Sequence, residues 1–383
     1  MRILHMADLH VGKSLNGFSL LPDQQVVFGQ IVAYARSERV QAAVVAGDVY
    51  DRQTPSAEAV RLFDDFLTAL SAEVEAVLIV SGNHDSPDRL AFAGRILEAR
   101  GIHLRCDYTP GRPPVTLEDA HGAVDFHLLP FLRPASVRRY FEGERIDGCQ
   151  EAVLSALSAL PVDAARRNVV VAHQFFAPPY GEEPQRSDSE AVAVGGLDRV
   201  DAALLDAFDY AALGHLHGPQ RVGREEVRYA GSPLKYSFSE CFHRKSVVLA
   251  DVRGKGDVRV DLLPLAPPRD LRRIRGPLAD LLRPEIVACG NREDYLHVTL
   301  TDEDTVLDAA GKLRSVYPNV MAVAFDNARS RAEGAVGEDA PLPERRSPDA
   351  LFGDFFLAQN GAPVRDDLLP FVEEALAEAG CGE

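Results

Sequence analysis

The sequence is poor in cysteine and has no long apolar run, and both features exclude classes of protein. Its five cysteines are scattered without CxxC spacing, which argues against a disulfide framework and against a zinc ribbon. A membrane span needs about 18 consecutive apolar residues, and no run here approaches that length. The first residues also lack a signal-peptide pattern. We therefore predict a protein of the reducing cytoplasm with no membrane partner.

Positive charge is scarce as well. The chain has 41 Lys and Arg against 58 Asp and Glu, a formal net charge of −17. This excess argues against a protein that holds nucleic acid by a broad basic face. It does not exclude a phosphodiester substrate, because bound divalent cations supply positive charge where the phosphate lies. We expect any grip on a long polymer to depend on local patches or on a partner chain.

A chain of 383 residues is long enough for two or more folding units. Strand-like runs alternate with helical stretches up to about Leu265, as in layered α/β domains, and the pattern breaks at Leu265–Arg269. Further on, Tyr295–Leu300 and Val320–Phe325 have strand patterns, and Glu303–Tyr317 has a helical one. We predict an α/β domain over residues 1–265, a small α+β domain over 266–326, a linker over 327–347 and C-terminal helices over 348–383.

Apolar residues at helical spacing and helix-start signals predict several elements in the first domain. Helices are predicted over Pro22–Arg36, Ala59–Leu70, Pro87–Ala99 and Gln150–Leu160, and strands over Val227–Ala230 and Ser246–Val252. The segment Pro178–Gly196 is rich in proline, glycine and charge. We interpret it as a mobile loop that contacts substrate.

Five short apolar runs share one property, which is that each ends in polar residues. Because the carboxyl ends of parallel strands meet at one edge of a sheet, ligands collect there. The runs are Arg2–Ala7, Ala42–Gly47, Ala76–Val80, Val169–Ala172 and Tyr210–Gly214. The polar residues that follow them are Asp8, His10, Asp48, Asp51, Asn83, His84, Asp85, His173, His215 and His217. This set predicts a metal centre.

Seven of these residues are candidate metal ligands. Carboxylate, carboxamide and imidazole groups without thiolate suit Mn²⁺, Fe²⁺ or Zn²⁺. A carboxylate directly after Gly47 can bridge two ions, so we predict two sites about 3.5–4 Å apart, the spacing used for displacement at phosphorus. The predicted ligands are Asp8, His10, Asp48, Asn83, His173, His215 and His217.

His84 and Asp51 are the candidate catalytic residues. His84 follows Asn83 and is placed to protonate the leaving oxygen or to stabilise the transition state. Asp51, three residues after Asp48, would orient His84 and keep it charged. Asp85 is interpreted as a turn cap or as support for the ligands.

Each residue also has a structural interpretation. A single Asp or His at the start of a loop usually caps a turn, and only the five blocks together favour metal. The other histidines are interpreted as structural; these are His5, His103, His121, His127, His243 and His297. A solvated surface position is the preferred interpretation, over phosphate contact, for Lys13, Lys235, Arg244 and Lys245. The apolar stripe of Phe352, Phe355 and Phe356 fits core packing and partner docking about equally.

The blocks as a set resemble the calcineurin-like metallophosphoesterase superfamily over roughly the first 265 residues. They are Asp8–His10, Gly47–Asp51, Gly82–Asp85, His173 and Gly214–His217. Within this span, Leu128–Phe131 and Tyr229–Glu240 (YAGSPLKYSFSE) are similar to the SbcD family of bacterial nuclease subunits.

The resemblance implies a fold and an assembly. The fold would be an α/β four-layer metallophosphoesterase sandwich, two β-sheets flanked by helices, with a small α+β capping domain that binds DNA. C-terminal helices would dock an SbcC-type ATPase, a partner of the SMC-like class. The chain would form a homodimer through helices near Ser56–Leu70 and Pro87–Ala99.

The resemblance also implies an activity. This is a Mn²⁺-dependent 3′–5′ exonuclease on duplex DNA and an endonuclease on hairpins or single strands, gated by ATP hydrolysis in the partner and serving DNA repair, recombination and replication. It assigns Asp8, His10, Asp48 and His217 to one ion and Asp48, Asn83, His173 and His215 to the other, with His84 catalytic. Asp51 departs from the pattern, because archaeal and eukaryotic relatives carry a second histidine there. Gly47–Arg52 is similar instead to the GDxxDR of phosphoprotein phosphatases, in which the aspartate pairs with the catalytic histidine.

Two rival functions stay open on the residues alone, since a fold and its metals do not determine the substrate. One is a free-standing metallophosphoesterase that acts on a small phosphomono- or diester. The other is a scaffold that has lost catalysis and only recruits a partner. The aromatic tail and the YAGSPLKYSFSE segment favour the nuclease over the first rival, and the complete ligand set favours it over the second.

Overall fold

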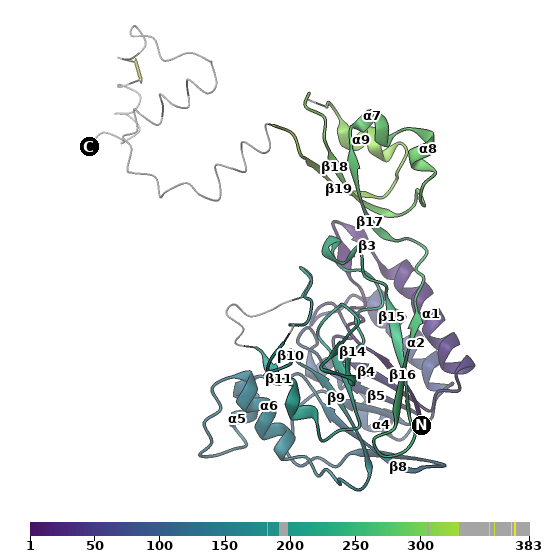
Figure 1. Ribbon diagram of the computed structural model, residues 1–383, viewed down its shortest axis with the longest axis vertical. Coiled ribbons are helices and arrows are strands. Elements are labelled where there is room, and N and C mark those ends of the chain that lie inside the picture. Colours follow the sequence, from purple (N-terminus) through teal and green to yellow (C-terminus); the bar gives the residue numbers. More distant parts are fainter. Residues whose placement is uncertain are drawn as a thin grey trace. The chain divides into compact units, whose positions relative to one another are not determined.

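The computed structural model describes residues 1–181, 183–190, 198–304 and 306–328, together with Phe352, Phe356, Leu369, Phe371 and Val372. The chain divides into two compact units. One comprises Met1–Leu300 with Val306–Ala324, and the other comprises Thr301–Thr305 with Phe325–Glu383. The first unit contains both large sheets and a smaller third sheet (Figure 1).

The first large sheet has six strands in the order β16-β15-β1-β4-β5-β6. Strands β1, β4, β5 and β6 run parallel, whereas β15 and β16 are antiparallel additions at one side. The bounds are β1 Arg2–Met6, β4 Ala42–Ala46, β5 Ala76–Val80, β6 Ile102–Arg105, β15 Ser246–Val252 and β16 Val258–Pro264. Three of the predicted ligand blocks follow β1, β4 and β5, so the parallel pairing brings their carboxyl ends to one edge.

The second large sheet also has six strands, in the order β13-β14-β12-β9-β8-β7. Its central strands β8, β9, β12 and β14 are parallel. The bounds are β7 Val115–Asp119, β8 Gly122–Leu129, β9 Arg167–His173, β12 Tyr210–Gly214, β13 Gln220–Val222 and β14 Arg224–Tyr229. In register, Gly214 at the end of β12 lies opposite His173 at the end of β9. The remaining predicted ligands therefore share one edge of this sheet.

The buried side chains of β4 alternate between two cores. Ala42, Val44 and Ala46 belong to the core between the two sheets, whereas Ala43 and Val45 belong to the core under the helices of the first sheet. Because successive side chains of a strand point to opposite faces, this alternation shows a sheet that is covered on both sides.

Strand β9 of the second sheet shows the same alternation. Val169 and Val171 lie in the core between the sheets, and Val170 and Ala172 lie in the core under the opposite helices. The two sheets and their outer helices thus form four layers, as the family resemblance implies.

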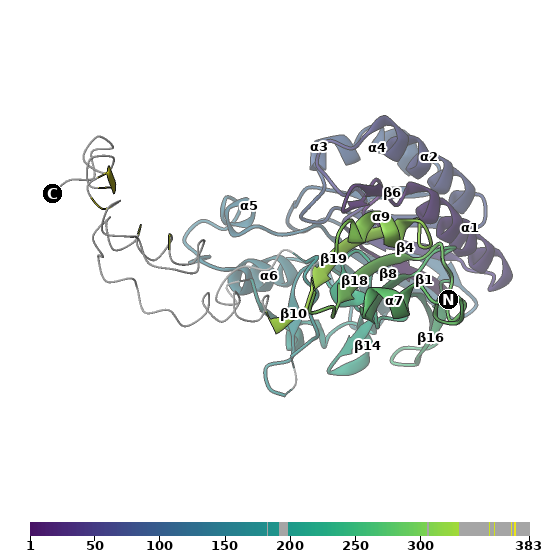
Figure 2. The same ribbon diagram turned by 90° about the horizontal axis from the view of Figure 1, so that it is seen from above.

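The outer layers are helical. Helices α1 (Leu21–Ser37) and α2 (Ala57–Ser71) cover the first sheet, with the rings of Phe28 and Phe66 stacked 4.5 Å apart. Helices α5 (Pro134–Arg138) and α6 (Cys149–Ser158) cover the second sheet. Figure 2 shows α1 and α2 together on one flank and α5 and α6 on another.

A third sheet follows the sandwich in the order β17-β18-β19. It has its own small core with Leu296, Val298, Leu313 and Val320. Its elements are β17 Leu271–Gly276, α7 Leu278–Leu281, α8 Pro284–Val287, β18 Tyr295–Leu300, α9 Ala309–Arg314 and β19 Val320–Phe325. The smaller elements of the chain are β2 Ser14–Leu15, β3 Phe18–Ser19, β10 Phe176–Ala177, β11 Val200–Asp201 and the 3₁₀ turns Ala202–Leu205 and Phe238–Glu240.

Several predicted elements differ from the structure. The helix predicted over Pro87–Ala99 is two short helices, α3 (Pro87–Leu90) and α4 (Gly94–Glu98), because Ala93 between them adopts a left-handed φ of 59°. The helix predicted over Glu303–Tyr317 is shortened to α9. By contrast, the strands predicted over Ser246–Val252, Tyr295–Leu300 and Val320–Phe325 have the observed bounds.

Most of the predicted linker and C-terminal helices lie outside the described residues. Phe352, Phe356, Leu369, Phe371 and Val372 are helical, and Phe355 is not described. No helix in the described part of the chain is long and apolar enough to cross a membrane. Among the described cysteines, Cys106, Cys149, Cys241 and Cys289 carry free thiols.

Candidate metal centre

The loops after β1 and β4 are joined by backbone hydrogen bonds. Asp8 N–H donates to the Gly47 carbonyl over 3.1 Å, and His10 N–H donates to the Asp48 carbonyl over 3.0 Å. Positive φ angles occur at Asp8 (53°), His10 (42°) and Asp48 (49°), and also at His215 (107°). Residues other than glycine rarely adopt a positive φ. Where they do, the surrounding structure holds them there, often at functional sites.

Glycine allows the strand ends to approach one another closely. A Cβ atom on Gly214 would lie 1.9 Å from the Ala46 carbonyl oxygen, and one on Gly47 would lie 2.3 Å from the ring of His173. A Cβ on Gly82 would lie 2.1 Å from Oδ1 of Asp48. The two sheets therefore meet at these edges only because no side chain stands between them.

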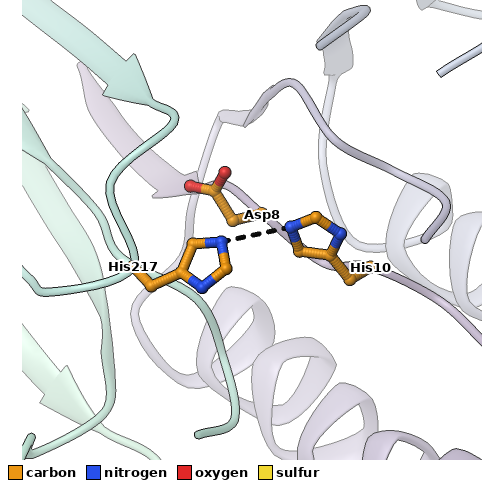
Figure 3. Close-up of side chains that lie close together, drawn as sticks. All are labelled: Asp8, His10 and His217. Carbon is orange, nitrogen blue, oxygen red and sulfur yellow. Dashed lines mark hydrogen bonds between the residues drawn. The ribbon is translucent and has the colours of Figure 1, made fainter. Parts of the chain in front are cut away.

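Asp8, His10 and His217 form one half of the centre (Figure 3). All three side chains are buried, and Nε2 of His10 lies 3.2 Å from Nε2 of His217. Both oxygens of Asp8 accept the backbone N–H of His215 at 3.1 Å. Two imidazole nitrogens that face each other beside a carboxylate are suited to share one cation.

Asp48 belongs to the other half of the centre. Its Oδ2 is 3.4 Å from Nε2 of His173 and 3.6 Å from Nε2 of His10. Oδ1 of Asn83 lies 3.0 Å from Nε2 of His173 and 3.2 Å from Nδ1 of His215. The carboxylate of Asp48 thus faces ligands of both halves, which is the placement expected of a bridging group.

Hydrogen bonds on the far ring nitrogens orient two of the imidazoles. Nδ1–H of His173 donates to the Ala46 carbonyl over 2.8 Å, so Nε2 is the ring nitrogen that faces Asp48 and Asn83. Nδ1 of His217 lies 2.7 Å from Oγ of Ser189, whose hydroxyl donates to Glu240 over 2.5 Å. Support of this kind by a carbonyl or a carboxylate is a regular feature of metal-binding histidines.

Burial shifts the pKa of each group toward its neutral form, whereas a neighbouring opposite charge shifts it toward the charged form. Burial lowers the pKa of His10 well below its usual value and lowers that of His215 to about 3, so both imidazoles are neutral and able to bind metal. Burial raises the pKa of Asp8. Although burial also acts on Asp48, the neighbouring His173 holds the pKa of that carboxyl far below its usual range.

The residues present fit divalent metal. Three sets of side chains bring their ligand atoms within 4.8 Å of one another; these are Asp8, His10 and His217, then His10, Asp48 and His84, and then Asp8, Asp48 and His173. His215 belongs to none of these sets, but its Nε2 is buried and has no hydrogen-bond partner in the described part of the chain. A buried imidazole nitrogen without a partner is costly unless a water molecule or a cation binds it.

The two candidate catalytic residues are in contact through the main chain of Asp51. Nδ1 of His84 lies 3.0 Å from the backbone carbonyl of Asp51, not from its carboxylate. The Asp51 carboxylate instead lies 2.8 Å from Nζ of Lys13 and 3.6 Å from Nδ1 of His10. The contact of Asp51 with His84 is therefore made by its carbonyl, while its carboxylate faces Lys13 and His10. The interpretation of Asp85 as a turn cap is confirmed, because its carboxylate accepts the backbone N–H groups of Val49, Tyr50 and Gly82.

Sequence reasoning missed several residues that support the centre. Gln24 of α1 donates to the carbonyls of Leu9 and His10 and to the hydroxyl of Tyr236, at 2.8–3.1 Å. Tyr236 and Glu240 belong to the YAGSPLKYSFSE segment, which was the available signal for both. Nothing in the sequence marks Gln24.

Lys245 does not occupy the solvated position predicted for it. Its side chain is buried, and Nζ donates to Glu240 over 2.6 Å and to Ser232 and the His217 carbonyl over 2.8 Å. It neutralises Glu240, whose carboxylate in turn accepts a hydrogen bond from the Ser189 hydroxyl. Arg244 is exposed as expected. His5 fits its structural interpretation, with Nδ1 2.9 Å from the hydroxyl of Tyr210.

The described part of the Pro178–Gly196 loop contacts the centre through His217. Ser189 reaches the ring of His217, and Oε1 of Glu190 accepts the backbone N–H of His217 over 2.6 Å. The loop thus lies against the half of the centre that contains Asp8.

Family comparisons agree with this geometry. A family model described as calcineurin-like phosphoesterase matches residues 1–219, and one described as Type 5 capsule protein repressor C-terminal domain matches residues 267–360. The SbcD subunit of the SbcCD nuclease of Staphylococcus epidermidis is 32% identical over 337 residues, which is 86% of this chain and 87% of that protein.

The chain belongs to the calcineurin-like phosphoesterases, in the family of SbcD nuclease subunits. It is accordingly a metal-dependent phosphodiesterase. Two solved structures also align with this chain, each with a TM-score of 0.38, which is too low to carry an argument. One is GAP50, the anchor in the inner membrane complex of Plasmodium, at 13% identity over 86% of this chain and 98% of that chain. The other is a dimetal phosphatase from Danio rerio, at 15% identity over 70% and 99%. These values are too low to bear on activity.

Proposed function

We propose that this chain is the nuclease subunit of an SbcCD-type complex and that it cleaves DNA phosphodiesters with two divalent ions, Mn²⁺ in the cell. The observation that carries the proposal is the 32% identity to the SbcD subunit of Staphylococcus epidermidis over 86% of this chain. That alignment spans 337 residues, which is more than the phosphoesterase model matches. The likeness therefore includes chain outside the metal-binding domain.

The chain's own residues have separate tasks in this proposal. Asp8, His10, Asp48 and His217 would hold one ion, and Asp48, Asn83, His173 and His215 the other. When bound, two such ions supply positive charge at the phosphate and lower the pKa of water.

His84 is proposed to act on the leaving group. Because its Nδ1–H is taken up by the Asp51 carbonyl, its Nε2 is left to face the substrate. A positioned imidazole there would stabilise or protonate the leaving 3′ oxygen, a contribution of about 10²–10⁴-fold.

The proposed reactions are 3′–5′ exonuclease on duplex DNA and endonuclease on hairpins and single strands, in DNA repair, recombination and replication in the cytoplasm. Residues 266–326 would cap the DNA, and the helices within 348–383 would dock an SbcC-type ATPase whose ATP hydrolysis gates access. A formal charge of −17 supports the need for such a partner, because an acidic surface repels the DNA backbone.

We also propose a homodimer that uses α2, α3 and α4. Phe92 and Ile96 are 81% and 73% exposed, and Val60 on α2 is 44% exposed. Exposed apolar side chains grouped on neighbouring elements mark interaction surfaces in soluble proteins.

The test is hydrolysis by the purified full chain with Mn²⁺. The substrates are blunt duplex DNA, hairpin DNA and bis-p-nitrophenyl phosphate, each with and without an SbcC-type ATPase and ATP. We expect DNA cleavage by the wild type and its loss in His84→Gln, with metal content unchanged. Turnover of the small diester while DNA stays intact, even with the ATPase present, would contradict the proposal. That result would favour a free-standing phosphoesterase of small substrates.

A further inference from the structure

Two arginines lie on aromatic rings that pack against the metal-centre histidines. The guanidinium of Arg133 is 5.4 Å from the ring centre of Phe131, and that of Arg186 is 4.0 Å from the ring centre of Phe175. Both residues are exposed. Both phenylalanines in turn contact the ring of His215, at centroid distances of 6.4 and 6.5 Å. Each arginine is therefore only one aromatic ring away from a predicted ligand.

The backbone anchors Arg133 firmly. Phe131 N–H donates to the Ser81 carbonyl over 2.9 Å, next to the Gly82–Asp85 turn, and Leu132 N–H donates to Gln174 over 3.3 Å. Arg133 itself is the N-cap residue of α5. This attachment to the ends of both sheets places the guanidinium at the rim of the centre.

Arg186 is held by the loop that contacts His217. Gln185 exchanges two hydrogen bonds with the side chain of Gln220, at 2.8 and 2.9 Å. Ser187 N–H donates to Glu190 over 2.9 Å, and Glu190 accepts from the His217 backbone. Both neighbours of Arg186 are thus fixed, which limits the entropy lost when its side chain binds a ligand.

Neither guanidinium has a carboxylate partner among the described residues, although the chain has 58 acidic side chains. Arginine stacked on an aromatic face keeps its N–H groups free and points them in a fixed plane. Its fork matches the oxygens of a phosphate. Two unpaired cations beside a phosphodiesterase centre in an acidic protein are therefore suited to bind phosphate.

A cavity beside the same loop offers room for a polymer. It measures about 640 Å³ and is lined by Gln185, Gly218, Arg221 and Arg244, among others. Gln185 precedes Arg186, and Gly218 follows His217. A strand that leaves the metal centre past Arg186 would meet Arg221 and Arg244 there, beside the acidic Glu183.

We propose that Arg133 and Arg186 bind the phosphates that flank the scissile phosphate of a single DNA strand, and so select polymers over small phosphodiesters. The inference rests on the proposed nuclease function and adds the residues that grip the strand. The rings of Phe131 and Phe175 hold the guanidinium groups, and the ions act on the central phosphate.

The test compares a single-stranded oligonucleotide with bis-p-nitrophenyl phosphate, which has no flanking phosphate. The full chain with Mn²⁺ is assayed as wild type, Arg133→Gln, Arg186→Gln and the double variant. Arg2→Gln is the matched control, because it removes an exposed arginine at the opposite, amino end of β1. We expect the KM for the oligonucleotide to rise about tenfold in the double variant, and the slope of log KM against log salt to fall by about 0.7 for each arginine. Turnover of the small diester should be unchanged.

The conservative variants Arg133→Lys and Arg186→Lys keep the charge and should keep the salt slope. Two results would overturn the inference while the nuclease proposal stands. One is unchanged oligonucleotide KM and salt slope in the double variant, and the other is an equal loss on both substrates, which would mean that the arginines only shape the centre. A wild type that cleaves the small diester and no DNA would instead refute the nuclease function itself.

Discussion

The two large sheets contribute different chemistry to the centre. The first sheet supplies the oxygen groups of Asp8, Asp48 and Asn83, with His10 as its one predicted imidazole ligand, whereas the second supplies imidazoles alone. Hard oxygen and borderline nitrogen ligands together suit Mn²⁺, Fe²⁺ or Zn²⁺ better than either set would alone. The centre therefore forms only where the two sheets meet, because neither sheet alone supplies the whole set of predicted ligands.

The two aspartates of the first sheet sharpen this contrast. Asp48 faces His173 of the second sheet and accepts the backbone N–H of His84 over 2.9 Å. Within the described residues, the Asp8 carboxylate accepts the backbone N–H of His215 alone. The pKa of Asp48 is accordingly lowered, while burial raises that of Asp8. Both carboxylates contact the second sheet, and it is the short approach of His173 to Asp48 that outweighs burial there, whereas burial dominates at Asp8.

The largest expected effect comes from replacing the aspartate that faces both halves. Asp48→Asn should lower kcat by about 10³-fold and abolish binding of both ions, because the group aimed at both sites is lost. Asp8→Asn should cost about 10²-fold and leave one ion bound. Hydrolysis of bis-p-nitrophenyl phosphate and metal content by mass spectrometry check this. Equal metal loss in the two variants would contradict a bridging role for Asp48.

The next effect concerns the junction between the sheets. Gly214→Ala would place a Cβ against the Ala46 carbonyl, and such overpacking should lower the free energy of unfolding by about 1–3 kcal/mol or more. Gly29→Ala on α1 is the matched control, since its added Cβ would meet no atom within 4 Å apart from the neighbouring backbone of its own helix. It should stabilise by about 0.5–1 kcal/mol. Urea unfolding measures both, and a neutral Gly214→Ala would mean that the sheets separate easily.

A smaller effect is expected from replacing a residue that hydrogen-bonds to a predicted ligand of the second sheet. Ser189→Ala removes the hydroxyl that bridges His217 and Glu240, leaves only the longer direct contact of 3.4 Å between them, and should weaken Mn²⁺ binding by about 10-fold. Ser155→Ala is the control, because that hydroxyl also donates to a glutamate, Glu144, over 2.8 Å at an exposed site. Metal titration by calorimetry separates the two, and equal affinities would show that His217 needs no support.

The smallest effect is a pH dependence of the metal-free protein. A folded pKa raised above the unfolded value of about 3.9 means that the folded state binds the proton more tightly, so this contribution of Asp8 to stability is lost as the pH rises above about 4. Because burial raises the pKa of Asp8 to about 7, the wild type should lose stability relative to Asp8→Asn progressively between about pH 4 and 7. Added Mn²⁺ should remove this loss. Parallel stability curves for the two proteins would contradict a raised pKa.

Much of the fold followed from local patterns. Buried parallel strands are nearly continuous apolar runs, and apolar residues also mark the strands at Ser246–Val252 and Tyr295–Leu300, which were predicted with their observed bounds. The break at Ala93 was not visible, because alanine carries no signal for a left-handed φ. The predicted domain boundaries and the roles of the ligands remain predictions.

Local patterns in the chain predicted which side chains would lie near one another, because each follows an apolar run and parallel strands bring such positions to one edge. How these side chains are supported became visible only in the folded molecule. Gln24, Ser189 and Lys245 reach the centre from other parts of the chain. The Asp51 carboxylate forms an ion pair with Lys13, whereas the Asp51 carbonyl accepts a hydrogen bond from His84. Strand pattern is a local property, whereas hydrogen-bond partners depend on which surfaces pack together, and no local pattern contains that information.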